Sequence, residues 1–174
     1  MIESTRFPTN KNHYMKRGST FFLQAVVAFL GLATLAVCLF ALPAIWQGSS
    51  AELPTATNAI YLIIIGLYLT AIPFFIAQWQ AIKLLRYIKE NKAFSELSVK
   101  ALRTSKQCWT AIAVLYLAGV PLLLPIAQAD DAPGLMLMGI VIAMAPVAVA
   151  VFAAVLEQLF ESGMNLKSEN ELTV

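Results

Sequence analysis

Charged side chains are scarce in this sequence. Only 13% of its 174 residues are charged, which is about half the share found in soluble domains, whereas 59% are hydrophobic and the mean hydropathy is +0.73. A water-soluble protein of this composition would have too few polar groups to cover its surface. The shortage of charge therefore argues against a water-soluble fold and favours a membrane protein.

Histidine and cysteine are nearly absent as well. The single histidine, His13, lies in a polar amino-terminal segment, where we expect it to be solvated. Of the two cysteines, Cys38 lies late in the first apolar run and Cys108 at the start of the third, so their different depths predict no disulfide. The apolar runs also lack a Ser-His-Asp set, metal-ligand spacing and a glycine-rich phosphate loop. We therefore predict a protein that is not an enzyme and has no cofactor.

Lysine and arginine are missing from two long stretches, residues 18–82 and 107–166. Between these stretches lies a basic hinge, residues 83–107, and the remaining cations lie near the two ends of the chain. The hinge holds seven of the twelve basic residues: Lys83, Arg86, Lys89, Lys92, Lys100, Arg103 and Lys106. This distribution is typical of a multi-span membrane protein.

The apolar stretches are long enough for four membrane-spanning helices, since about 20 apolar residues cross the hydrocarbon layer. We predict an all-α, antiparallel four-helix bundle over residues 19–161, with a basic tail at 1–18 and an acidic tail at 162–174. The first run is longer than the apolar core of a signal peptide, so we expect it to be retained. The predicted spans are residues 20–46, 58–82, 108–128 and 134–160.

The placement of the cations also predicts the orientation of these spans. The amino-terminal tail, the hinge and the carboxyl-terminal tail carry all twelve Lys and Arg residues, and the two turns at the other end carry none. By the positive-inside rule, both termini and the hinge are cytoplasmic. We therefore expect a multi-pass protein of the bacterial cytoplasmic membrane, in contact with lipid.

Within the hinge, Ser95 is a good helix N-cap, and Phe94 and Val99 have the spacing of a hydrophobic staple. We expect a short helix at residues 96–105 that lies near the inner membrane surface, with Leu97 and Leu102 on its apolar side. In the fourth span, Gly139 and Ala143 have the spacing that lets helices approach closely.

Two stretches resemble a known family. They are the hinge, where Phe94-Ser95 precedes a helix that ends in Leu102-Arg103, and the carboxyl terminus, with Glu169, Glu171, Leu172 and Thr173. Both are similar to the bacterial membrane proteins grouped as domain of unknown function 2975. The resemblance runs from the second span to the end and implies a small four-helix membrane protein. It supplies no catalytic residues, but it implies that a small helix-turn-helix regulator is encoded beside the gene.

Two classes of function follow from these features. We expect a membrane-held partner of a helix-turn-helix regulator, with docking residues in the hinge and the terminus and without direct nucleic-acid binding. The alternative is an oligomeric transporter or channel subunit for ions or small solutes. Glu157 and Glu161 are the acids that such a role would use, although ordinary pairing with hinge cations explains them as well.

Overall fold

The chain folds into four long helical rods. The computed structural model describes residues 12–52, 56–90 and 95–172, and this described part contains no strand. In chain order the elements are α1 (Asn12–Ala36), the π-helical turn η1 (Val37–Ala41), α2 (Leu42–Glu52), α3 (Thr57–Lys89), α4 (Glu96–Gly119), the 3₁₀ turn η2 (Val120–Leu122), α5 (Leu123–Ala129) and α6 (Gly134–Leu172). The first rod consists of α1, η1 and α2, the third consists of α4, η2 and α5, and α3 and α6 are the second and the fourth.

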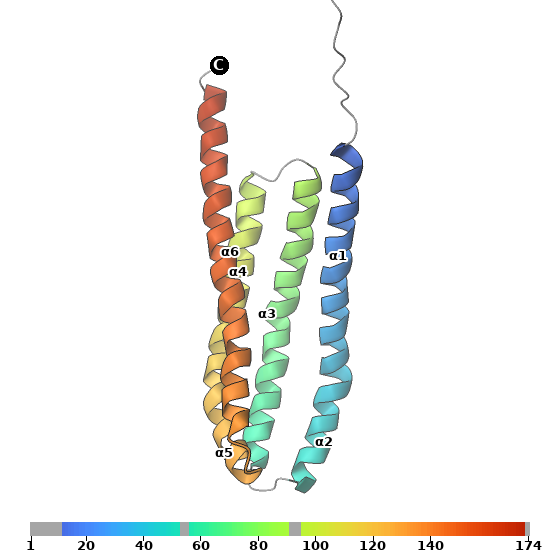
Figure 1. Cartoon of the computed structure of the whole chain (residues 1–174), viewed down its shortest axis with the longest axis vertical. Coiled ribbons are helices and arrows are strands. Elements are labelled where there is room, and N and C mark those ends of the chain that lie inside the picture. The colour runs from blue at the N-terminus through green and yellow to red at the C-terminus, as the bar shows by residue number, and fades with distance from the viewer. Residues whose placement is uncertain (1–11, 53–55, 91–94, 173–174) are drawn as a thin grey trace, which may run out of the picture.

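The rods run antiparallel, as the charge pattern predicts (Figure 1). We call the end that holds α1's start, the α3–α4 connection and α6's end the termini end, and the opposite end the turn end. Four helical segments are long and apolar enough to cross a membrane: Phe21–Gly48, Thr57–Lys89, Glu96–Ala129 and Gly134–Leu166. The expected all-α, four-helix membrane fold is therefore confirmed.

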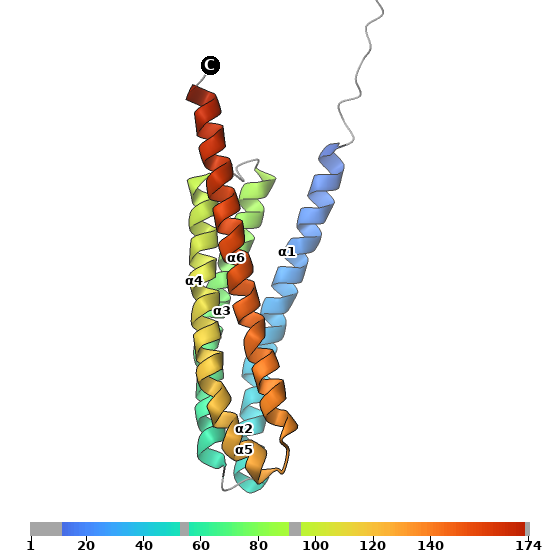
Figure 2. The same cartoon turned by 60° about the vertical axis from the view of Figure 1, so that its left-hand side comes forward.

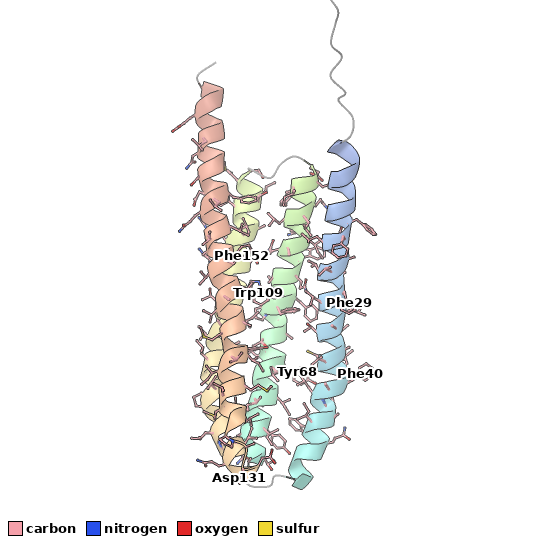
Figure 3. All side chains as sticks on the ribbon, in the orientation of Figure 1. Phe29, Phe40, Tyr68, Trp109, Asp131 and Phe152 are labelled. Atoms are coloured by element: carbon pink, nitrogen blue, oxygen red, sulfur yellow. The ribbon has the colours of Figure 1, made fainter. Side chains whose placement is uncertain are left out.

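Large apolar side chains cover the outside of these rods. Phe29 on α1 is 71% exposed, Phe40 on η1 is 76% exposed, and Phe152 on α6 is 63% exposed (Figure 3). Exposure of this extent along every rod would be unstable in water, whereas lipid chains solvate it readily. The outer surface therefore faces lipid.

Small residues let the central helices approach closely. α4 makes its most extensive contacts with α6 and α3, and the face of α6 toward the bundle includes Ala143 and Ala153, both nearly fully buried. At Gly139, a methyl group would overlap the side chain of Leu123. The predicted close approach at Gly139 and Ala143 is confirmed, and it arises because dispersion packing replaces the hydrophobic effect inside a membrane.

The first rod is peripheral to a core made of α3, α4 and α6. α1 contacts α3 and leans away from the other helices toward the termini end (Figure 2). At the turn end, Leu42, Ile60 and Ile64 form a buried cluster, and Trp46 stacks on Tyr61 with ring centroids 4.3 Å apart. The first rod is thus held by its contacts with α3 and by this cluster at the turn end.

A π-helical turn interrupts the first rod one residue before Leu42-Pro43. Leu42 donates its backbone N–H to Val37 O, and Pro43 has no N–H to donate to the next carbonyl, Cys38 O. The hydroxyl of Tyr68 on α3 donates to that carbonyl at 2.8 Å, and Tyr68 lies on the side of α3 near the first rod (Figure 3). In lipid such a carbonyl needs a partner, and here a neighbouring helix supplies it.

Several local predictions were wrong. The expected short helix at residues 96–105 is the first part of α4, which continues into the third span without a break. Residues 106–109 contain no helix breaker, so the helix crosses the membrane surface unchanged. Leu97 is 55% exposed rather than packed, whereas Leu102 is buried.

Candidate functional site

Four ionisable side chains meet where α4 and α6 pass each other near the termini end. α4 contributes Arg103 and Lys106, which are three residues apart. α6 contributes Glu157 and Glu161, which are four residues apart. Both spacings place side chains on one face of a helix, so two cations face two acids across the α4–α6 contact.

Glu157 is the centre of this ion cluster. Its side chain is only 7% exposed, and its oxygen Oε1 accepts a hydrogen bond from Arg103 Nε at 2.8 Å. The ammonium of Lys106 forms an ion pair with the other oxygen, Oε2, at 2.5 Å. Arg103 Nη2 also lies 3.7 Å from Glu161 Oε1, and both of these side chains are about half exposed. One buried carboxylate thus holds two cations.

This arrangement neutralises a charge that would otherwise be unstable inside the protein. Burying an isolated carboxylate costs several kcal/mol of folding free energy, and the attraction of two close cations offsets a cost of about this size. Because the cations come from α4 and the acid from α6, the pairing also selects one axial register of the two helices. Among the described residues, no group of three His, Cys, Asp or Glu side chains could hold a metal ion.

The structure separates the other predicted docking residues. Ser95 takes the extended N-cap conformation of α4 but makes no side-chain capping hydrogen bond. Leu102 is buried in the core at 4% exposure, and Arg103 belongs to the ion cluster. Glu169 is exposed on the last turns of α6. Phe94 and Thr173 lie outside the described residues, as do the side chains of Glu171 and Leu172.

Two adjoining cavities, which sequence reasoning missed, lie deeper in the bundle. One is about 370 Å³ and lies between the first rod, α3, α4 and α6, with Trp109 and Pro146 in its wall. The other is about 380 Å³, is almost entirely apolar, and lies between α3, the α4–η2–α5 rod and α6. They share Thr70 and Tyr116. The prolines were the only sequence signal, since they predict imperfect helix packing without locating a cavity.

Comparison with known proteins agrees with this architecture. Residues 44–174 match the family described as "Protein of unknown function (DUF2975)". The chain is also 46% identical over 160 residues, 92% of its length, to the whole of the "Uncharacterized membrane protein YoaS" of Bacillus subtilis (strain 168). No solved structure matches. The match covers three of the four rods and α2, and on this basis the chain belongs to the DUF2975 family of membrane proteins.

Proposed function

We propose that this protein is a membrane-held docking protein without catalysis, and that its termini end binds a soluble regulator in the cytoplasm. The partner that the family resemblance implies is a small helix-turn-helix transcription factor. The positive-inside rule supports the cytoplasmic placement, since every Lys and Arg in the described part of the chain lies toward this end. In this proposal the protein holds the regulator at the membrane and away from DNA.

The length of α6 is the observation that supports this proposal most strongly. The helix has 39 residues and is therefore about 58 Å long, at about 1.5 Å per residue. Crossing the hydrocarbon layer needs only about 30 Å. Figure 1 shows that α6 extends well beyond the end of α3 and the start of α4 at the termini end. Spanning the membrane does not require this extension, but a rigid docking element would.

The charge of the extension suits a basic partner. The last part of α6 carries Glu161, Glu169 and Glu171, and Lys167 is the one cation among them. DNA-binding domains present basic surfaces to the phosphate backbone. An acidic helix can therefore occupy the surface that such a regulator would turn toward DNA. This competition would couple docking to the release of DNA.

The test first asks whether a small helix-turn-helix regulator is encoded beside this gene, and then measures binding of that regulator to the full chain in detergent. We expect Glu169→Gln with Glu171→Gln to weaken binding by about 3- to 10-fold, since exposed charges contribute up to about 1 kcal/mol each. Asp130→Asn with Asp131→Asn is the matched control, because it removes two acids from the turn end. Equal binding by both double variants, or no binding by the unmodified chain, would contradict the proposal.

Transport by an oligomer is the second candidate, and the two adjoining cavities favour it. They lie inside the bundle and together approach the size of small-molecule sites. Against it, Glu157 is already held by Arg103 and Lys106. Solute or ion flux into liposomes that is abolished by Glu157→Gln, in a variant that remains folded, would favour transport over docking.

A further inference from the structure

Three cations on the last turns of α3 have no acidic partner in the described part of the chain. Lys83, Arg86 and Lys89 follow one another at three-residue spacing, so they occupy one side of the helix over about 120°. None of them forms an ion pair with another described residue, whereas Arg103 and Lys106 are paired with Glu157. The positive charge of α3 is therefore left uncompensated. Arg86 and Lys89 are also exposed.

The position of these cations along α3 matches a membrane surface. No Lys, Arg, Asp or Glu occurs between Glu52 and Lys83, so Lys83 is the first charge after the apolar part of the helix. Trp79, one turn earlier, is 61% exposed, and tryptophan is enriched at the level of lipid headgroups. The ammonium of Lys83 lies 5.9 Å from the centre of the Trp79 ring. An aromatic and a cation thus lie together at the depth of the headgroups.

Neighbouring helices leave this part of α3 accessible. α1 is the rod that lies beside α3 on its outer side, and it leans away from the bundle toward the termini end (Figure 2). Farther from the termini end, Gln78 Nε2 on α3 lies 3.6 Å from the position that a methyl group on Gly31 would occupy, so the two helices are in contact there. Closer to the termini end than Gln78, the side chains of Arg86 and Lys89 are exposed.

We propose that this α3 basic face, made of Trp79, Lys83, Arg86 and Lys89, binds the headgroup of an anionic phospholipid. A guanidinium can hold a phosphate through two parallel hydrogen bonds, and the flanking ammonium groups act as point charges. The indole ring and the apolar part of α3 would contact the acyl chains below. The α3 basic face lies at the depth of the headgroups, directly above the apolar part of α3. This position favours a lipid over a soluble phosphate, which has no apolar part to contact that surface.

This site is distinct from the acidic extension of α6 that the proposed function uses. A simpler account holds that the three cations only determine topology during membrane insertion. That account predicts no lipid preference once the protein has been purified. Lipid binding by the purified full chain therefore separates the two accounts.

The first experiment needs no variant. The full chain in a neutral detergent is titrated with phosphatidylglycerol, with phosphatidylcholine, and with inorganic phosphate, and thermal unfolding is followed. We expect phosphatidylglycerol alone to raise the unfolding temperature, and we expect added salt to reduce this effect because it screens exposed charges. Equal shifts with both lipids, or an equal shift with inorganic phosphate, would overturn the proposal.

The second experiment locates the site. Each of Lys83→Gln, Arg86→Gln and Lys89→Gln should weaken the apparent affinity for phosphatidylglycerol by about fivefold, since a basic residue near an anionic surface contributes about a factor of this size. Lys100→Gln, which removes an exposed cation from α4 at the same end, is the matched control. Lys83→Arg should retain binding. If Lys100→Gln weakens binding as much as the α3 variants, the site is not on α3.

Discussion

The two carboxylate oxygens of Glu157 face different cations. Arg103 binds Oε1 and Lys106 pairs with Oε2, while the side chain of Glu157 is 7% exposed. Loss of either cation leaves the buried charge with one partner, whereas loss of both leaves it with none. The energetic consequences of the two losses should therefore not be additive, because one charge is shared by two partners.

This non-additivity gives the first prediction. Arg103→Gln and Lys106→Gln should each destabilise the bundle by about 1 kcal/mol. The double variant should lose about 3–5 kcal/mol, because it leaves an unpaired buried carboxylate. Adding Glu157→Gln to the double variant should restore most of this loss. Chemical unfolding in detergent measures all four variants, and additive single effects without restoration would contradict the shared role of Glu157.

The close approach at Gly139 gives a second prediction. Gly139→Ala should destabilise the bundle by at most about 1 kcal/mol, because the added methyl group forces Leu123 Cδ1 to move aside and the cost of that rotamer change competes with the gain in helix propensity. In a Leu123→Ala background the same substitution should be neutral or stabilising. Gly66→Ala in α3 is the control, since nothing lies within 4 Å of its added methyl group.

The order of unfolding temperatures after heating in detergent decides this prediction. We expect Gly139→Ala to unfold below the unmodified chain and Gly66→Ala to unfold at or above it. If Gly139→Ala is as stable as Gly66→Ala, then α6 does not approach the η2–α5 segment as closely as described.

At the scale of single residues, part of the ion cluster could be predicted from the sequence. Pairing of Glu157 and Glu161 with hinge cations was expected, because both lie toward the same end of the bundle, and the structure brings Glu157 to Arg103 and Lys106. Which cations pair could not be derived, since this depends on the rotation of α4 about its axis. Docking at the hinge and the terminus stays a prediction, to which Leu102 cannot contribute because it is buried.

Among the elements, the first rod departs most from a regular helix. The first span was predicted to end at residue 46, yet the rod continues through η1 and through α2, which contains Pro43, to Glu52. The π turn allows this continuation, and Tyr68, thirty residues away in sequence, supplies a hydrogen bond to Cys38 O. Sequence patterns describe neighbours along one helix, so they could not predict a hydrogen bond between two helices.

A third prediction tests this bond. Tyr68→Phe should destabilise the protein by about 0.5–2 kcal/mol, the range for hydrogen bonds between helices in membranes. In a Pro43→Ala background the loss should shrink, because alanine restores a backbone N–H to this region. Tyr116→Phe is the control, since no hydrogen bond of that hydroxyl is found in the described part of the chain. Equal losses for Tyr68→Phe in both backgrounds would contradict this account of η1.

The boundaries of α4 and α6 show why charge patterns locate membranes better than helix ends. Charges predicted where each span leaves the lipid, but a helix retains its hydrogen bonds in water as well as in lipid. α4 therefore begins at Glu96, well before the third apolar run, and α6 continues to Leu172. Only a capping residue or a helix breaker ends a helix, and residues 162–172 contain neither a proline nor more than one glycine.

For the molecule as a whole, the fact that lipid is the solvent explains why the number of spans and their order could be predicted. Lipid requires every backbone polar group to be paired within a helix and excludes most charge from the spans. Four spans and their antiparallel order follow from these two requirements. The peripheral place of α1 and the cavities do not follow, because they depend on how side chains of different helices fill space. Such packing is not encoded by hydropathy along the chain.

The central claim is that the termini end forms one polar face on the cytoplasmic side. The most direct measurement is the accessibility of an epitope tag inserted within residues 91–94 in one variant and within residues 53–55 in another. We predict that intact spheroplasts bind antibody to the second tag alone, and that the first is reached only after the membrane is permeabilised. Binding to both tags from the same side, or to the first tag alone in intact spheroplasts, would contradict the account.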